Sequence, residues 1–403
     1  MINFLNKYLK RVHFSKPNAS DIVILDEANS DLIQGVIPEG LTVSICKMRP
    51  VEFYITPRIV LSFLRNLRYF KFTNGSESNK SSFYRIFFQL LCIYLKADLM
   101  SRNPKAIVTS TDNCSKFAWL SENYQLAPCI AIQNGFRLSY AANSMDTYYC
   151  QHLFCFGERE IADFPGMNYK VDNFYPVGSL NLTLNFDHQL ADLKPIYDLL
   201  VVSCWRGNIG YARDVEDSMK AMRLMDESLA KYLQNRDLKV AIIMRSERDS
   251  DQWVMPEIGM SEEDYYKSIY GDLIEIIDVN FAQRNIYPVM QSAEVIIAGF
   301  STTCLIEAYA MRKKILYMNF CGNNEYHRDF KPEILFEGHD DNSPSFESRL
   351  NALLEISSQE YVMKHEETME FYMRDPLTFS RDHIRRGIND IIFSKSDYIG
   401  TLT

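Results

Sequence analysis

The stretch from Ser292 to Asn319 constrains the fold more than any other part of the chain. An apolar run, Val295–Ala298, is followed by a turn at Gly299 and by a helical segment. A second apolar run, Ile315–Met318, comes after that segment. Short apolar runs bounded by turn residues are typical of buried strands. The order strand, turn, helix, strand therefore predicts a parallel α/β unit, whose ligands bind beyond the carboxyl ends of its strands.

The predicted helix begins with three hydroxyl residues, Ser301, Thr302 and Thr303. Hydroxyl side chains cap helices, and the free backbone N–H groups at a helix start attract anions such as phosphate. Glu307 follows in the same helix, where its carboxylate is near enough to meet a ribose hydroxyl. We predict a nucleotide site at this helix end. The alternative from these residues alone is that Ser301 is only an N-cap and Glu307 only a solvated helix residue.

Short apolar runs of the same kind recur along the chain, and each ends in a polar or glycine-containing turn. They are Ile22–Leu25, Thr42–Cys46, Ala106–Thr109, Cys129–Ile132, Leu153–Phe156, Tyr175–Gly178, Leu199–Ser203, Val240–Met244 and Ile274–Ile277. Helical segments separate most of them. This alternation predicts an α/β protein with doubly wound parallel sheets.

The chain of 403 residues is long enough for two domains. Its regular alternation breaks over Asn185–Tyr197, which contains Pro195, so we place the interdomain linker there. We predict an N-terminal domain over residues 1–190 and a second domain over residues 191–375. A charged helical tail follows over residues 376–403.

Composition excludes several classes of protein. The net charge of -9 argues against a general nucleic-acid binder, which needs basic surface to neutralise phosphates. The nine cysteines include no CxxC pair and predict buried thiols in a reducing compartment. Cys150 and Cys155, with His152 between them, fit no standard zinc spacing, and we expect no metal site. We find no signal peptide and no apolar run of the roughly 18 residues that span a bilayer. We therefore expect a cytoplasmic protein, or one peripheral on the inner face of the membrane.

Two segments combine basic and apolar residues. Phe4–Val12 reads as a basic amphipathic helix, which lies either on an anionic membrane or on its own domain. Pro57–Tyr94 is rich in aromatic and basic residues and is interrupted by the polar loop Thr73–Ser82. We expect one or two core-facing helices there. The alternative is a surface that meets a lipid-linked or anionic acceptor.

Residues 299–317, GFSTTCLIEAYAMRKKILY, resemble the C-terminal domain signature of GT-B glycosyltransferases. The resemblance extends through short motifs over about residues 20–375. It implies two Rossmann-like domains that face a cleft, with a C-terminal helix that crosses back to the first domain. It also implies that Gly299 and the hydroxyl turn bind the donor phosphate and that Glu307 binds the ribose.

Within this fold, the motifs resemble those of bacterial surface-carbohydrate transferases. Asp26-Glu27-Ala28 is similar to the D/E-D/E-G motif of sialyltransferases and polysialyltransferases, in which the second acidic residue is the general base. Ala28 replaces the glycine. Ser301-Thr302 resembles the step that binds the phosphate of CMP-linked donors. The resemblance implies that Glu27, or else Asp26, deprotonates the acceptor hydroxyl.

Two turns depart from the pattern. Asn134, before Gly135, stands where glycerophosphate and Kdo-type transferases often carry a histidine, and a third acceptor-side residue, Arg137, follows. The expected His-Pro motif of the second domain is replaced by Met244-Arg245-Ser246. Arg245 and Arg206 can each hold a phosphate as bidentate donors, which stabilises the leaving nucleotide without a metal.

We therefore expect a metal-independent glycosyltransferase. It would move a sugar, by preference a CMP-linked ulosonic acid such as Kdo or sialic acid, to a growing surface polysaccharide or lipopolysaccharide. A CDP-glycerol-type polyol-phosphate transferase is one alternative, although it normally carries histidines at both catalytic turns. A nucleotide-sugar 2-epimerase shares the fold but needs an acid/base set that these motifs do not supply. A non-catalytic GT-B-like scaffold that binds a partner transferase is the fourth possibility.

Overall fold

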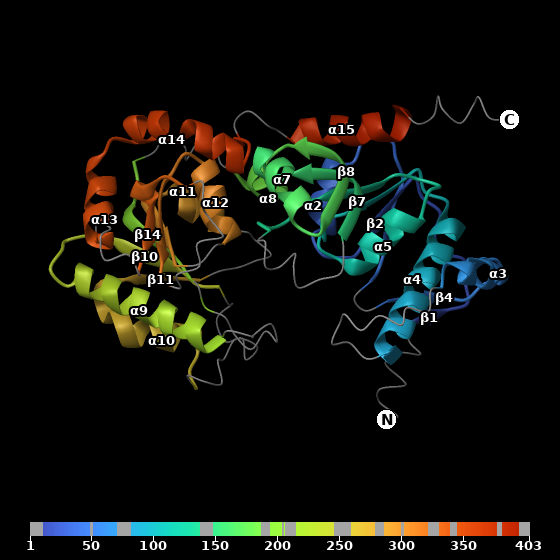
Figure 1. Ribbon diagram of the computed structural model, residues 1–403, viewed down its shortest axis with the longest axis horizontal. Coiled ribbons are helices and arrows are strands. Elements are labelled where there is room, and N and C mark those ends of the chain that lie inside the picture. Colours follow the sequence, from blue (N-terminus) through green and yellow to red (C-terminus); the bar gives the residue numbers. More distant parts are fainter. Residues whose placement is uncertain are drawn as a thin grey trace.

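The computed structural model describes residues 11–48, 51–70, 82–137, 148–186, 194–203, 205, 215–245, 259–278, 286–299, 302–320, 330–338, 345–376 and 381–394. Over these residues the chain forms two α/β domains that lie side by side (Figure 1). Each domain is built on a parallel sheet of six strands. This is the predicted architecture.

The first sheet has the strand order β3-β2-β5-β6-β7-β8. Its strands are β2 (Ile22–Leu25), β3 (Val43–Cys46), β5 (Ala106–Thr109), β6 (Cys129–Ile132), β7 (Tyr148–Cys155) and β8 (Tyr169–Pro176). The helices that accompany them are α2 (Ser30–Val36), α5 (Ser115–Asn123), α7 (Glu158–Asp163) and α8 (Leu180–Asn185). Successive residues of β2 point to opposite faces, so that Val23 and Ile24 enter two different apolar clusters. Both faces of this sheet are therefore covered, as is typical of parallel sheets.

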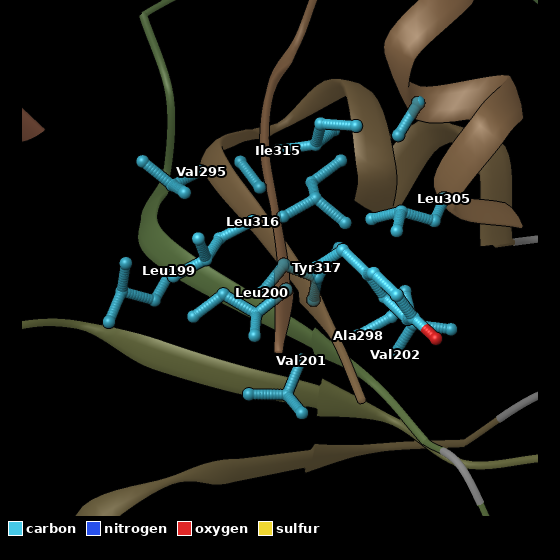
Figure 2. Packing of buried hydrophobic residues seen from close by; sticks show 14 of the residues in the cluster. Leu199, Leu200, Val201, Val202, Val295, Ala298, Leu305, Ile315, Leu316 and Tyr317 are labelled. Atoms are coloured by element: carbon cyan, nitrogen blue, oxygen red, sulfur yellow. The ribbon is translucent and has the colours of Figure 1, made fainter. Parts of the chain in front are cut away.

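The second sheet has the order β11-β10-β9-β12-β13-β14. Its strands are β9 (Tyr197–Val202), β10 (Val240–Ile243), β11 (Glu275–Ile277), β12 (Ala293–Ala298), β13 (Lys314–Asn319) and β14 (Leu335–Glu337). Its helices are α9 (Val215–Leu233), α10 (Glu262–Tyr270), α11 (Ile286–Gln291), α12 (Thr303–Ala310), α13 (Phe346–Glu355) and α14 (Ser358–Tyr372). Figure 2 shows the core, where Val202, Ala298 and Tyr317 lie side by side on three neighbouring strands, with Leu305 of α12 in the same cluster.

The strand order of each sheet defines one switch point, where the chain leaves a central strand in opposite directions. In the first sheet it lies between β2 and β5, and in the second between β9 and β12. Helices that follow two such strands lie on opposite faces of the sheet, which leaves a crevice beyond the strand ends. Ligands of open α/β sheets bind in this crevice, so the two switch points define where a site is to be sought.

The C-terminal helix α15 (Arg381–Ser394) returns to the first domain, as predicted (Figure 1). The chain crosses at Arg374, whose backbone N–H donates to the Phe156 carbonyl at 2.9 Å. Beyond the crossing, Ile384 and Ile388 are fully buried in the first domain, and Arg385 donates to the Gly35 carbonyl at 3.1 Å. The return of α15 thus ties the second domain to the first through apolar contacts.

Two local expectations were wrong. Val12, expected in a helix, lies in β1 (Val12–His13), which pairs with β4 (Phe53–Tyr54); the residues before Arg11 lie outside the described part of the chain. The second segment does form two helices, α3 (Pro57–Asn66) and α4 (Ser82–Arg102). However, much of their apolar surface is exposed instead of facing the core. The predicted boundary at residue 190 falls among residues that the structure does not describe.

Gly157, in the turn after β7, allows α14 to approach the first domain. A Cβ atom on this residue would lie 2.4 Å from the Phe371 carbonyl oxygen, which is backbone and cannot rotate away. We predict that Gly157→Ala lowers the free energy of unfolding by about 1–3 kcal/mol, the usual cost of overpacking. Gly166→Ala is the matched control, because a Cβ there would meet nothing within 4 Å. Urea denaturation of both variants checks this, and equal stabilities would contradict it.

Candidate functional site

In the second domain, the crevice beyond β9 and β12 is lined by residues that follow these two paired strands. Val202 pairs with Ala298, so Ser203 and Gly299 come next on neighbouring strands. The Ser203 hydroxyl donates to the Glu262 carboxylate and accepts from the Trp205 backbone N–H at 3.1 Å. Ser203 and Glu262 together therefore hold the chain in place just beyond the end of β9.

Arg245 follows β10 and lies at the same edge. Its backbone N–H donates to the buried Glu262 carboxylate at 2.8 Å, and its guanidinium donates to the Trp205 carbonyl at 3.0 Å. Desolvation raises the pKa of the Cys304 thiol to about 12, and the positive charge of Arg245 opposes this shift. Arg245 and the start of α12 therefore lie at the same edge of the second sheet.

The two described hydroxyl residues at the start of α12, Thr302 and Thr303, have different hydrogen-bond partners. Thr302 is the N-cap, and its hydroxyl accepts from the Cys304 backbone N–H at 3.1 Å. The Thr303 hydroxyl accepts from the backbone N–H of Phe136, in the first domain, at 3.0 Å. Ser301 and the other predicted phosphate ligand, Arg206, lie outside the described residues. The phosphate contacts of the hydroxyl turn stay a prediction.

Glu307 is not the solvated helix residue of the alternative interpretation. Only 2% of it is exposed, and its Oε1 atom accepts from the Ser179 hydroxyl at 2.5 Å and from the Tyr287 hydroxyl at 3.1 Å. Burial raises the pKa of this carboxyl to about 7, although the two hydrogen bonds act against the shift. Ser179 belongs to the first domain, so Glu307 bridges the two domains. Its predicted contact with a ribose stays a prediction.

In the first domain, the two acidic residues after β2 have different surroundings. Asp26 is buried, has a positive φ of 87°, and accepts the Glu27 backbone N–H at 2.8 Å. The Glu27 side chain is 48% exposed and forms an ion pair of 2.7 Å with Lys47. The left-handed conformations of this turn fall on Asp26 and Asn29, so an alanine fits at position 28. Asp26 thus orders the turn, and Glu27 presents a carboxylate at its surface.

The predicted acceptor-side residues are organised by Asp112, which follows β5 and is almost fully buried. Its carboxylate accepts from the Arg137 guanidinium, at 2.8 Å for Nε, and from the Asn134 backbone N–H at 3.4 Å. Arg137 also donates to the Asn134 side-chain oxygen at 2.8 Å. The Gly135 carbonyl accepts from Gln133 at 3.1 Å. The turn after β6 is therefore rigid, and the charge of Arg137 is balanced internally.

These contacts connect the switch points of both domains. The Ser110 hydroxyl donates to the Ala28 carbonyl at 2.9 Å, and Asp112 lies two residues further along the chain. From Asp112 the contacts continue through Arg137 and its turn to Thr303 of the second domain. The predicted donor-side and acceptor-side residues thus adjoin. Among the described residues, no group of three or more His, Cys, Asp and Glu side chains is placed to hold a metal ion.

Lys47, Asp112, Ser179, Ser203 and Glu262 were not predicted as parts of this site. Each supports a predicted residue or a strand end through a partner that is distant in the sequence, 128 positions away for Ser179 and Glu307. The same signal was available for four of them: Lys47, Asp112, Ser179 and Ser203 lie at or just after the end of a predicted strand, where ligand-facing residues are expected. Glu262 had no such signal.

Comparisons with known proteins support the fold. No family model and no curated protein matches the sequence. A crystal structure from Listeria monocytogenes, provisionally assigned as a UDP-N-acetylglucosamine 2-epimerase, is similar with a TM-score of 0.50 and 14% identity. The match covers 94% of this chain and 98% of that one. UDP-GlcNAc 2-epimerase from Neisseria meningitidis matches with a TM-score of 0.46 and 13% identity, over 93% of this chain and 99% of that one. The chain has the GT-B fold, with two Rossmann-like domains.

The bridging carboxyl of Glu307 predicts a pH dependence of stability. Its pKa is about 7 in the folded state against 4.5 for an ordinary glutamate, so the folded state binds more protons between these values. The free energy of unfolding should therefore fall as pH rises from 4.5 to 7, by up to about 3 kcal/mol from this group. Glu307→Gln keeps an oxygen acceptor for Ser179 and removes the titration. Its stability relative to the wild type should rise over that range and level off above pH 7.

Chemical denaturation at a series of pH values measures this difference. Glu347→Gln, at an exposed position of α13, is the control and should keep the wild-type profile. Parallel profiles for wild type and Glu307→Gln would show that Glu307 does not retain its proton on folding.

Proposed function

We propose that the chain is a glycosyltransferase that uses a nucleotide-activated sugar. One observation carries this proposal: the hydrogen bond from the Phe136 backbone N–H to the Thr303 hydroxyl, at 3.0 Å. It joins the turn that we assign to the acceptor to the helix start that we assign to the donor. Sugar transfer requires both substrates to be held together, and a crevice shared by two Rossmann-like domains provides such a place.

The donor would bind with its phosphate at the start of α12. Backbone N–H groups at a helix start and the cationic side chain of Arg245 both favour an anion there. They would also stabilise the negative charge that develops on the leaving nucleotide, without a metal. Arg206 and Ser301 are proposed as further ligands. The preference for a CMP-linked ulosonic acid rests on the resemblance of the Ser301-Thr302 step and of the acidic pair.

The base would be Glu27, because its carboxylate is half exposed while that of Asp26 is buried. In the proposed step, the acceptor hydroxyl oxygen forms a bond to the anomeric carbon and the bond from that carbon to the donor phosphate breaks. The hydroxyl proton passes to Glu27. The Lys47 ammonium lies 2.7 Å from this carboxylate. Asn134, Gly135 and Arg137 would contact an oligosaccharide or lipid-linked acceptor.

Nucleotide binding tests the donor half of the proposal. We expect one of CMP, CDP, UDP, GDP and ADP to raise the melting temperature of the purified protein, because a ligand of the folded state stabilises it by mass action. Arg245→Ala should abolish the shift, whereas Arg236→Ala, at an exposed position after the end of α9, should keep it. A shift with CMP alone supports the ulosonic acid, and a shift with UDP or GDP alone supports another sugar. No shift with any nucleotide would favour a non-catalytic scaffold.

Turnover tests the catalytic half. Glu27→Gln removes the base and should lower the rate of nucleotide release in the presence of acceptor by about 100-fold or more. The nucleotide-induced thermal shift should remain, since Glu27 lies in the other domain. Asp31→Asn, in the following helix, is the control for the loss of one negative charge. Unchanged turnover in Glu27→Gln would exclude this residue as the base.

A further inference from the structure

Exposed apolar side chains concentrate on one part of the first domain, the α3–α4 hairpin, defined here as residues 55–70 and 83–97. Sixteen large apolar side chains are exposed among the described residues, and nine of them lie in this hairpin. The nine are Ile55, Val60, Leu61, Leu64, Leu67, Phe83, Tyr84, Ile86 and Phe87. A concentration of this kind on a soluble domain marks an interaction surface, whereas single exposed apolar residues need no explanation.

Helix α3 carries its apolar residues on the outer face. Val60, Leu61 and Leu64 are 43%, 49% and 55% exposed, while Ile59 and Asn66 on the opposite face are buried. An ordinary surface helix has the reverse arrangement, with its apolar stripe toward the core. The same holds for the first turns of α4, where Phe83 is 79% exposed. The outer face of the hairpin therefore presents apolar side chains that contact with an apolar phase would remove from water.

The charges of the hairpin have one sign. Residues 55–70 and 83–97 contain no Asp or Glu, although the whole chain has a net charge of -9; the connecting residues 71–81 contain one, Glu77, with Lys71 and Lys80. Arg58, Arg65 and Arg68 are exposed beside the apolar side chains of α3. Figure 1 places the hairpin at the end of the first domain that faces away from the second domain. A large flat surface can therefore reach the hairpin without meeting the second domain.

We infer that the α3–α4 hairpin docks on an anionic lipid bilayer. Exposed aliphatic and aromatic side chains with flanking arginines match the residues that insert at the boundary between headgroups and acyl chains. Anionic lipids attract each arginine, and no carboxylate of the hairpin opposes that attraction. A second copy packed on the same face would instead bring like charges together. No described helix is long and apolar enough to cross a membrane.

This docking is independent of the proposed sugar transfer, because it uses none of the residues of the crevice. It predicts binding of the full-length protein to vesicles of phosphatidylcholine with phosphatidylglycerol, and weaker binding to phosphatidylcholine alone. High salt should weaken the binding by screening the arginines. Sedimentation with vesicles measures the partition coefficient in each case.

Two pairs of variants separate the apolar and the electrostatic contributions. Leu61→Ser with Leu64→Ser should lower the partition coefficient about tenfold or more. Leu224→Ser with Met363→Ser, which are 53% and 69% exposed on other helices, should leave it unchanged. These positions are exposed, so each protein should fold, as circular dichroism would verify.

Arg58→Gln with Arg65→Gln should lower partitioning to anionic vesicles about tenfold or more and leave the weak binding to neutral vesicles unchanged. Arg223→Gln with Arg386→Gln removes the same charge from exposed positions on other helices and should have no effect. On the wild type, anionic vesicles should also slow hydrogen exchange at residues 58–68. Three results would each overturn the inference: no binding by the wild type, equal loss in the control variants, or an oligomer that the leucine variant dissociates.

Discussion

The bonds that cross from one domain to the other hold this structure's crevice in one shape. The Thr303 hydroxyl accepts one of them from the Phe136 backbone N–H at 3.0 Å. The Ser179 hydroxyl donates another to the Glu307 carboxylate at 2.5 Å. They lie where the carboxyl ends of both sheets meet. A change in the relative position of the domains would break them and would also separate the proposed donor and acceptor sites. The geometry of the proposed reaction thus depends on a few polar contacts and on the return of α15 to the first domain.

The two crevices are built by similar means. In each, a buried carboxylate beyond a strand end accepts hydrogen bonds from a neighbouring turn: Asp112 from the turn after β6, and Glu262 from the turn after β10. A buried carboxylate is costly unless it is paired or hydrogen-bonded, so its partners are held firmly. Rigid turns of this kind pre-organise a site, because the residues they carry need no reordering when a substrate binds.

The central strands could be predicted closely from the sequence, but the edge strand β14 and the first six residues of β8 were missed. The supporting contacts could not be predicted. Strands β2, β5 and β6 are buried on both faces, so each reads as a continuous apolar run that ends at a polar residue. Strand β7 begins five residues before the predicted start at Leu153, because its first half alternates between buried and half-buried residues. Helix α3 was misassigned to the core because periodicity shows that a helix has an apolar face and not where that face points.

The turns that carry the candidate site could be predicted from the sequence, but the hydrogen bonds that support these turns could not. Gly299, Thr302, Glu27 and Arg245 lie at strand or helix ends, which local pattern can locate. The partners of these residues come from distant elements: Ser203 and Glu262 are 59 positions apart, and Asp112 and Arg137 are 25 apart. Only packing of the sheets brings them together. Local pattern also could not distinguish the buried Asp26 from the half-exposed Glu27.

Hydrogen exchange with and without a bound nucleotide tests most directly whether the shared crevice is the site. The nucleotide used would be the one that raises the melting temperature most. We expect slower exchange at the backbone amides of residues 302–306 and in the turn after β6, because a ligand at the start of α12 would stabilise both against local opening. Protection confined to other parts of the chain would contradict the assignment of this crevice to the donor.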